Sequence, residues 1–117
     1  MKTCLKMASS SSRVRKSLSQ ENQILYEVIA DIAPAARGDY LGWLTPHMAQ
    51  MLTYDGFLSG EIFISAEDEC EITSVYRLRD MAAMDAYLAG PAKDMRADGV
   101  KRFGGKLVAR RRILKAL

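Results

Sequence analysis

The stretch FLSGEIFISAEDECEITSVYRL, residues 57–78, decides the fold that we expect from this sequence. Residues 57–66 alternate as a strand does, and one side of that strand would carry Phe57, Ser59, Glu61, Phe63 and Ser65. Residues 70–78 are rich in the β-branched and aromatic types that strands prefer. The acidic residues 67–69 separate the two segments, so the stretch predicts a β-hairpin.

Helical patterns flank this hairpin on both sides. Before it, apolar residues recur at the spacing of an amphipathic helix over 41–52, and Pro46 should kink that helix. After it, a similar pattern over 81–95 follows Asp80, which is a suitable N-cap. This second helix should end at a glycine cap formed by Gly99.

The pattern is completed by a first strand at 24–32 and a last strand at 106–114. The order βαββαβ predicts an α+β fold of the ferredoxin-like kind, with a four-stranded antiparallel sheet and two helices on one face. We expect residues 24–114 to form this domain. The basic, serine-rich residues 1–23 are expected to be a disordered leader.

The sheet face away from the helices would be bare in a single chain. By alternation, it should carry the apolar residues Leu25, Ile29, Phe57 and Phe63. A half-apolar bare face would be sticky in a monomer, and face-to-face pairing of two copies would cover it. We therefore expect a homodimer.

Charge is distributed unevenly along the 117 residues. Twelve of the 17 Lys and Arg residues lie in 1–20 or 101–117, and neither segment contains an acid. The middle of the chain therefore has a net charge of −9, against +3 for the whole. This split allows contact with nucleic acid or an anionic membrane, but we favour charge complementarity within one assembly.

The cysteine and hydropathy patterns point to the cytoplasm. Cys4 and Cys70 fit neither a disulfide framework nor a metal-binding spacing. No apolar run approaches the roughly 20 residues of a membrane span, and residues 1–20 lack the apolar segment of a secretory signal. We expect no metal and no membrane contact.

Four segments of the chain resemble a known family. They are Trp43-Leu44-x-x-His47-Met48, Gly56-Phe57-Leu58-x-Gly60-Glu61-Ile62-Phe63, Tyr76-Arg77-Leu78-Arg79-Asp80 and Met95-Arg96-Ala97-Asp98-Gly99-x-x-Arg102-Phe103-Gly104-Gly105. They make residues 24–114 similar to the bacterial domain-of-unknown-function family 4286. The chain departs from that family's pattern at Gly90-Pro91, where we expect a bend instead of a polar helical turn.

The resemblance implies a place in the dimeric α/β-barrel superfamily, in which two ferredoxin-like sheets close around a cavity. That superfamily includes cofactor-free oxygenases, haem-degrading enzymes and small isomerases, whereas this family has no established reaction. A shared fold is weak evidence for shared chemistry. The resemblance therefore leaves open whether the protein is an enzyme.

His47 is the single histidine and a candidate for chemistry. It follows Trp43 by one helical turn, so the two side chains can touch. A histidine titrates near neutrality and could act as a general base, with Trp43 as a ligand-binding surface. The alternative is structural, because an imidazole after Pro46 can pack on the indole and satisfy freed backbone groups.

A second group of candidates should lie on the uncovered sheet face. Glu27 and Glu61 are candidate catalytic groups there, and Arg77 and one of residues 110–112 would bind a ligand, with Arg111 as our choice. A carboxylate and an arginine in a closed cavity could polarise a small polar molecule. Alternatively, the same charges form salt bridges that fix the register of the dimer.

Motifs for nucleotide binding, zinc proteases and nucleophile elbows are absent. The third strand has only Tyr76 where RNA-recognition modules need several aromatic residues, so a nucleic-acid partner is not expected. The sequence predicts a small cytoplasmic homodimer that binds a small organic molecule in its cavity without a cofactor. The alternatives are a non-catalytic assembly or regulatory module and, with less support, a cofactor-free monooxygenase-like enzyme or an RNA binder.

Overall fold

The structure, a computed structural model, describes residues 22–117. Residues 1–21, most of the expected leader, lie outside the described residues. Four strands form one sheet: β3 (Ile24–Ile32), β4 (Phe57–Ile64), β5 (Glu71–Leu78) and β6 (Leu107–Lys115). The sheet order is β4-β5-β3-β6, and every neighbouring pair is antiparallel.

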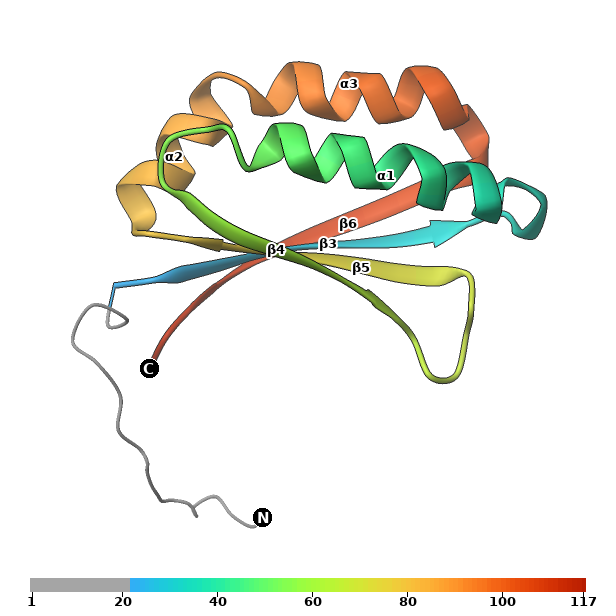
Figure 1. The fold of residues 1–117 in the computed structure, drawn as a ribbon, viewed down its shortest axis with the longest axis horizontal. Helices are drawn as coiled ribbons and strands as arrows, with labels where there is room; N and C mark the ends of the chain where they lie inside the picture. Colours follow the sequence, from blue (N-terminus) through green and yellow to red (C-terminus); the bar gives the residue numbers. More distant parts are fainter. Residues whose placement is uncertain (1–21) are drawn as a thin grey trace, which may run out of the picture.

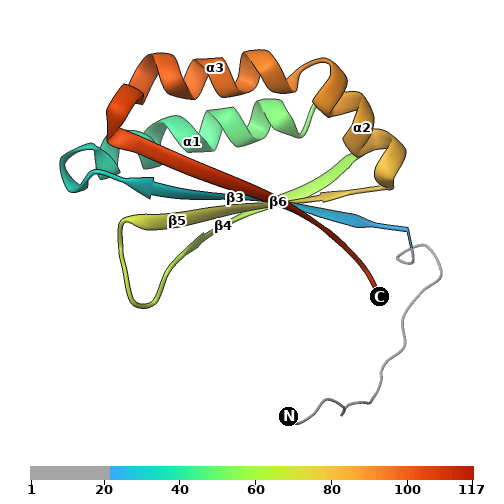
Figure 2. The same cartoon turned by 180° about the vertical axis from the view of Figure 1, so that it is seen from behind.

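Helices α1 (Arg37–Met51), α2 (Met81–Ala89) and α3 (Ala92–Phe103) all lie on one face of this sheet (Figures 1 and 2). Two 3₁₀ turns, η2 (Pro34–Ala36) and η3 (Gly104–Lys106), precede α1 and β6. The predicted ferredoxin-like α+β fold is confirmed. Among residues 22–117, no helix combines the length and apolar content that crossing a bilayer requires.

The second helical segment differs from the expectation at its end. Asp80 caps α2 as expected, because its carboxylate accepts a hydrogen bond from a first-turn N–H at 2.9 Å. Gly90-Pro91 separates α2 from α3, so the expected bend is a break. The expected end at Gly99 is wrong, because α3 continues through it; the glycine with positive φ that follows the helix is Gly104, at 54°.

Phe57 lies on the opposite face from the one we expected. The pairing of β4 with β5 shifts between Phe57 and Ser59, which is the signature of a β-bulge. The extra residue, Leu58, moves Phe57 to the helix-covered side, where it is 8% exposed and packs against Tyr54, Tyr76 and Tyr87. Phe63, beyond the bulge, keeps its expected place on the open face and is 51% exposed.

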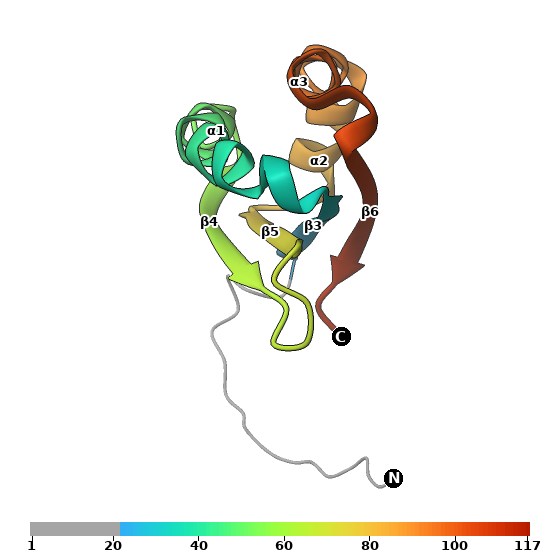
Figure 3. The same cartoon turned by 90° about the vertical axis from the view of Figure 1, so that its right-hand side faces the viewer.

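The core lies between the helices and the sheet. Its largest fully buried side chains come from the two central strands β3 and β5 and from α1 and α2: Tyr26, Ile72, Tyr76, Leu78, Met51 and Met84. Seen along the sheet, α1 stands above β4 and α3 above β6, while β3 and β5 form the floor between them (Figure 3). This arrangement places the centre of the sheet below the space that separates α1 from α3.

Candidate functional site

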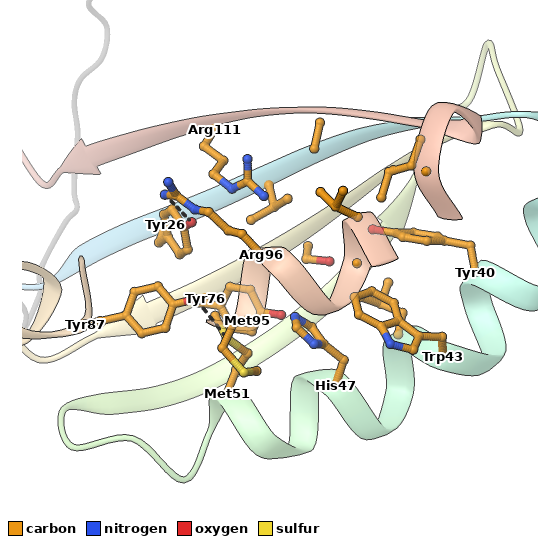
Figure 4. A pocket seen from close by; sticks show the side chains of 18 residues that line it. Tyr26, Tyr40, Trp43, His47, Met51, Tyr76, Tyr87, Met95, Arg96 and Arg111 are labelled. Atoms are coloured by element: carbon orange, nitrogen blue, oxygen red, sulfur yellow. Dashed lines mark hydrogen bonds between the residues drawn. The ribbon is translucent and has the colours of Figure 1, made fainter. Parts of the chain in front are cut away.

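A cavity of about 340 Å³ lies on the helix-covered side of the sheet, between α1 and α3 (Figure 4). Small-ligand pockets usually measure about 300–1,000 Å³, so this one is at the lower end of that range. Its lining is mostly aromatic and aliphatic, with two arginines, one histidine and one serine as further polar groups. None of the lining residues is Asp or Glu.

A cluster of tyrosines forms the floor and one end of the cavity. Tyr26 and Tyr76 are direct partners on β3 and β5, so both side chains point toward the helices, with ring centroids 6.1 Å apart. Tyr87 from α2 packs 5.9 Å from Tyr26, and Tyr40 reaches the cavity from α1. The tyrosines therefore give the cavity flat apolar walls that also carry hydroxyl groups.

Burial raises the pKa of three of these phenols. It raises the pKa of Tyr40 to about 12 despite the opposing charge of Arg111. It also raises the pKa of Tyr76 and of Tyr87 well above the usual value for tyrosine. At neutral pH these three hydroxyls are protonated, and that of Tyr87 donates to Met51 Sδ at 3.3 Å.

Trp43 and His47 form the wall on α1. Their rings are stacked, with centroids 4.2 Å apart and an interplanar angle of 25°, which confirms the contact predicted from their spacing. Trp43 Nε1 donates a hydrogen bond of 3.0 Å to Asp98 Oδ2 on α3, and a Cβ on Gly99 would lie 3.5 Å from the indole. That distance is an ordinary van der Waals contact, so α3 lies directly against Trp43, and the hydrogen bond to Asp98 fixes the ring.

His47 is neutral at neutral pH. Its partial burial lowers its pKa from the usual 6.5, and the nearby negative charge of Asp98 only partly opposes this. Among residues 22–117, no group in the structure forms a hydrogen bond with the imidazole. A neutral ring at the cavity wall can accept a proton from a bound molecule.

Two arginines line the cavity, Arg96 from α3 and Arg111 from β6. Arg96 Nη2 donates a hydrogen bond of 3.3 Å to the Tyr26 hydroxyl. Arg111 is paired in register with Val28, whose side chain faces the helices, and its charge lowers the pKa of Tyr40 and of Tyr87. Both arginines are exposed, so their guanidinium groups stand where the cavity meets solvent.

Ser74 contributes a buried hydroxyl from the middle of β5. It is 1% exposed, lines the cavity, and has no hydrogen-bond partner within the described part of the chain. The hydroxyl is close enough to Tyr76 to lower that residue's pKa slightly, but the two groups do not reach hydrogen-bond geometry. A buried hydroxyl without a partner is costly unless a bound molecule supplies one.

The structure separates the residues that the sequence suggested for a site. Trp43, His47 and Arg111 line the cavity. Glu27 and Glu61 lie on the opposite, open face of the sheet, where we had placed them, but this face does not border the cavity. Arg77 is also on the open face, where its Nη1 donates to the Gln23 side chain at 3.4 Å.

The three consecutive arginines of β6 do not share one side. Arg110 and Arg112 face the open side, and Arg112 forms an ion pair of 2.6 Å with Glu27 across the strands. Arg111 faces the helices, so it does not join Glu27 as our grouping required. The Arg112–Glu27 pair joins β6 to β3 within one chain, and a role of the open-face charges in the register of a dimer stays a prediction.

Sequence reasoning missed the tyrosines, Arg96 and Ser74 as cavity residues. Tyr26 and Tyr76 were visible as strand residues on the helix-covered face, but aromatic residues at such positions usually belong to a filled core. Among residues 22–117, no group of three or more His, Cys, Asp or Glu side chains is placed to hold a metal ion.

Strand order and helix placement define a ferredoxin-like α+β protein with a pocket between its helices and its sheet. The chain belongs to the family described as domain of unknown function 4286, whose model matches residues 23–117. Among curated proteins, no sequence matches this chain.

Solved structures share the fold at low sequence identity. SnoaB from Streptomyces nogalater, described as a cofactor-independent oxygenase, is 12% identical with a TM-score of 0.67, over 81% of this chain and 93% of SnoaB. A putative antibiotic biosynthesis monooxygenase from Nitrosomonas europaea is 15% identical with a TM-score of 0.66, over 84% of this chain and 93% of its own. A conserved protein from Methanosarcina mazei is 11% identical with a TM-score of 0.70, over 85% of this chain and 97% of its own.

Proposed function

We propose that this protein binds a small aromatic molecule in the cavity between α1, α3 and the sheet. The observation that carries the proposal is the cavity itself, about 340 Å³ in volume, with tyrosine and tryptophan rings as walls and few polar groups. Small-molecule sites typically combine such apolar walls with a few placed polar groups. Flat rings favour a flat, aromatic occupant.

A second candidate is a monooxygenase-like reaction without a cofactor. SnoaB carries that description and the Nitrosomonas protein a related one, which makes the chemistry worth testing here. The feature of this chain that favours it is His47, a neutral imidazole at the cavity wall with no hydrogen-bond partner among residues 22–117. Such a group could take a proton from an acidic position of the bound molecule, leaving an anion to react with dioxygen.

We further propose that two copies pair through the open sheet face in the cytoplasm. Two side chains on that face, Phe63 and Val108, are 51% and 67% exposed, which is costly for apolar groups in a lone chain. A free thiol at Cys70 fits a reducing compartment. A non-catalytic assembly module remains the alternative if the cavity binds nothing.

A pair of naphthalene probes, neutral 2-naphthamide and anionic 2-naphthoate, tests the binding function by isothermal titration calorimetry. At least one probe should bind the full chain. Ala109→Phe, which puts a ring into the cavity from β6, should abolish that binding, whereas the same change at Ala97, an exposed residue of α3 outside the cavity lining, should not. If neither probe binds, or if Ala109→Phe binds as well as the wild type, the proposed function is wrong.

A further inference from the structure

We infer that the molecule in this cavity is an aromatic carboxylate whose acid group lies between Arg96 and Arg111. This inference rests on the proposed function, because it names the chemical class of the occupant of the same cavity. Three observations support it: the cavity is lined by two arginines and no acid, these arginines have no carboxylate partner among the described residues, and the interior is aromatic with a free hydroxyl group.

The charged side chains that line the cavity are all positive. The lining residues include Arg96 and Arg111 but no acid, although the middle of the chain is strongly acidic. The two guanidinium groups come from different elements, α3 and β6, and both side chains point toward the cavity in Figure 4. A cleft lined by charge of one sign attracts ligands of the opposite sign.

The two arginines also have unused donors. Arg79 and Arg112 each form an ion pair with a carboxylate of the chain. Within the described residues, neither Arg96 nor Arg111 pairs with a carboxylate, and the only side-chain hydrogen bond that either makes is the one from Arg96 to the Tyr26 hydroxyl. A guanidinium has five N–H donors in a fork that matches a carboxylate, so an acid group at the cavity mouth would satisfy both residues.

The interior fits the aromatic part of such a molecule. Beyond the arginines, the cavity has the rings of Tyr26, Tyr76 and Tyr87, and its volume suits a compound of one or two rings. The unpartnered hydroxyl of Ser74 lies at the floor, where an oxygen substituent on the ring could pair with it. The cavity is therefore cationic at its mouth and aromatic inside.

The test compares 2-naphthoate with 2-naphthamide, which has the same shape and no charge, by calorimetry on the full chain. Naphthoate should bind about tenfold more tightly than naphthamide, the effect of one charge-assisted hydrogen-bond contact. If naphthamide binds as tightly, the anion is not recognised, and the inference fails while the proposed function stands. If neither binds, both fail together.

Variants locate the acid group. Arg96→Gln and Arg111→Gln should each lower the affinity for naphthoate about tenfold and leave the affinity for naphthamide unchanged. Arg110→Gln is the matched control, because it removes the same charge from the neighbouring residue on the other side of the sheet. Arg111→Lys keeps the charge and should retain part of the affinity. If Arg110→Gln and Arg111→Gln lost the same affinity for naphthoate, only the net charge of the protein would matter, which would overturn the inference.

Discussion

The charged side chains on the two sides of the sheet differ in whether they have partners of opposite charge. On the open face, Glu27 and Arg112 neutralise each other across neighbouring strands. On the helix-covered face, Arg96 and Arg111 stand beside a tyrosine cluster without any acid in the cavity lining. Charges paired within the chain already have their partner, whereas unpaired charges beside a cavity remain available to a ligand. The difference locates the candidate site on the covered face.

The largest effect should come from disrupting the turn that sets the register of β4. Gly56 has a φ of 87°, and a Cβ there would lie 2.3 Å from Cβ of Ala83 on α2. Gly56→Val should therefore lower the free energy of unfolding by about 3 kcal/mol or more, through backbone strain and overpacking. Chemical denaturation followed by circular dichroism measures the loss.

Gly42→Ala in α1 is the control for that variant. A Cβ at Gly42 meets nothing within 4 Å, so this change should raise stability by about 0.5–1 kcal/mol. If Gly56→Val were as stable as the wild type, the turn would not hold the register that places Phe57 under the helices.

The second largest effect tests the open face. Phe63→Glu introduces a charge at a half-exposed apolar position and should raise the dissociation constant of the proposed homodimer about a hundredfold, since each interface loses two phenyl rings. Sedimentation velocity at several concentrations measures this. Leu88→Glu, at an exposed position of α2, should leave the dimer intact. A wild-type chain that sediments as a monomer would refute the homodimer.

A smaller effect is expected from the hydrogen bond that joins α1 to α3. Asp98→Ala removes the acceptor of the Trp43 indole N–H and should cost about 1 kcal/mol of stability. It should also lower the pKa of His47 further, because Asp98 is the charge that opposes the effect of burial. An NMR titration of the single histidine measures the pKa. An unchanged value would mean that Asp98 does not act on the cavity wall.

The smallest effect should be the pH dependence due to His47. Because folding lowers the pKa of this residue, the unfolded chain binds its proton more readily than the folded chain does. The contribution of neutral His47 to stability is complete above the usual value of 6.5 and declines as the pH falls through the lower folded value. Between about pH 7.5 and 5.5, the wild type should therefore lose more stability than His47→Gln in parallel denaturation curves.

Most of the fold could be predicted from alternation and helical spacing, because each reports directly on which face is buried. The place of Phe57 could not, since a β-bulge adds a residue without any change in composition. The end of α3 was misplaced for a related reason. Gly99 looked like a cap, but it lies inside α3 against the indole of Trp43, a partner 56 residues earlier in the chain.

The candidate site was predictable only where its residues are close in sequence. Trp43 and His47 are one helical turn apart, and their contact followed from that spacing. The direction of Arg111 depends on the register between β6 and β3, which no local pattern specifies. Whether aromatic residues enclose a cavity or fill a core depends on how far apart α1 and α3 stand, which is a tertiary property.

The run Arg110-Arg111-Arg112 has a further consequence, because β6 is an edge strand of the described sheet. An edge strand of nine residues exposes backbone groups on which another chain could add a strand and begin aggregation. Arg112 is balanced by Glu27, but Arg110 and Arg111 have no carboxylate partner within residues 22–117, and their positive charges disfavour the addition of an identical strand. One short segment thus carries a cavity arginine, an interstrand ion pair and protection against polymerisation, and replacing all three arginines together would remove these at once.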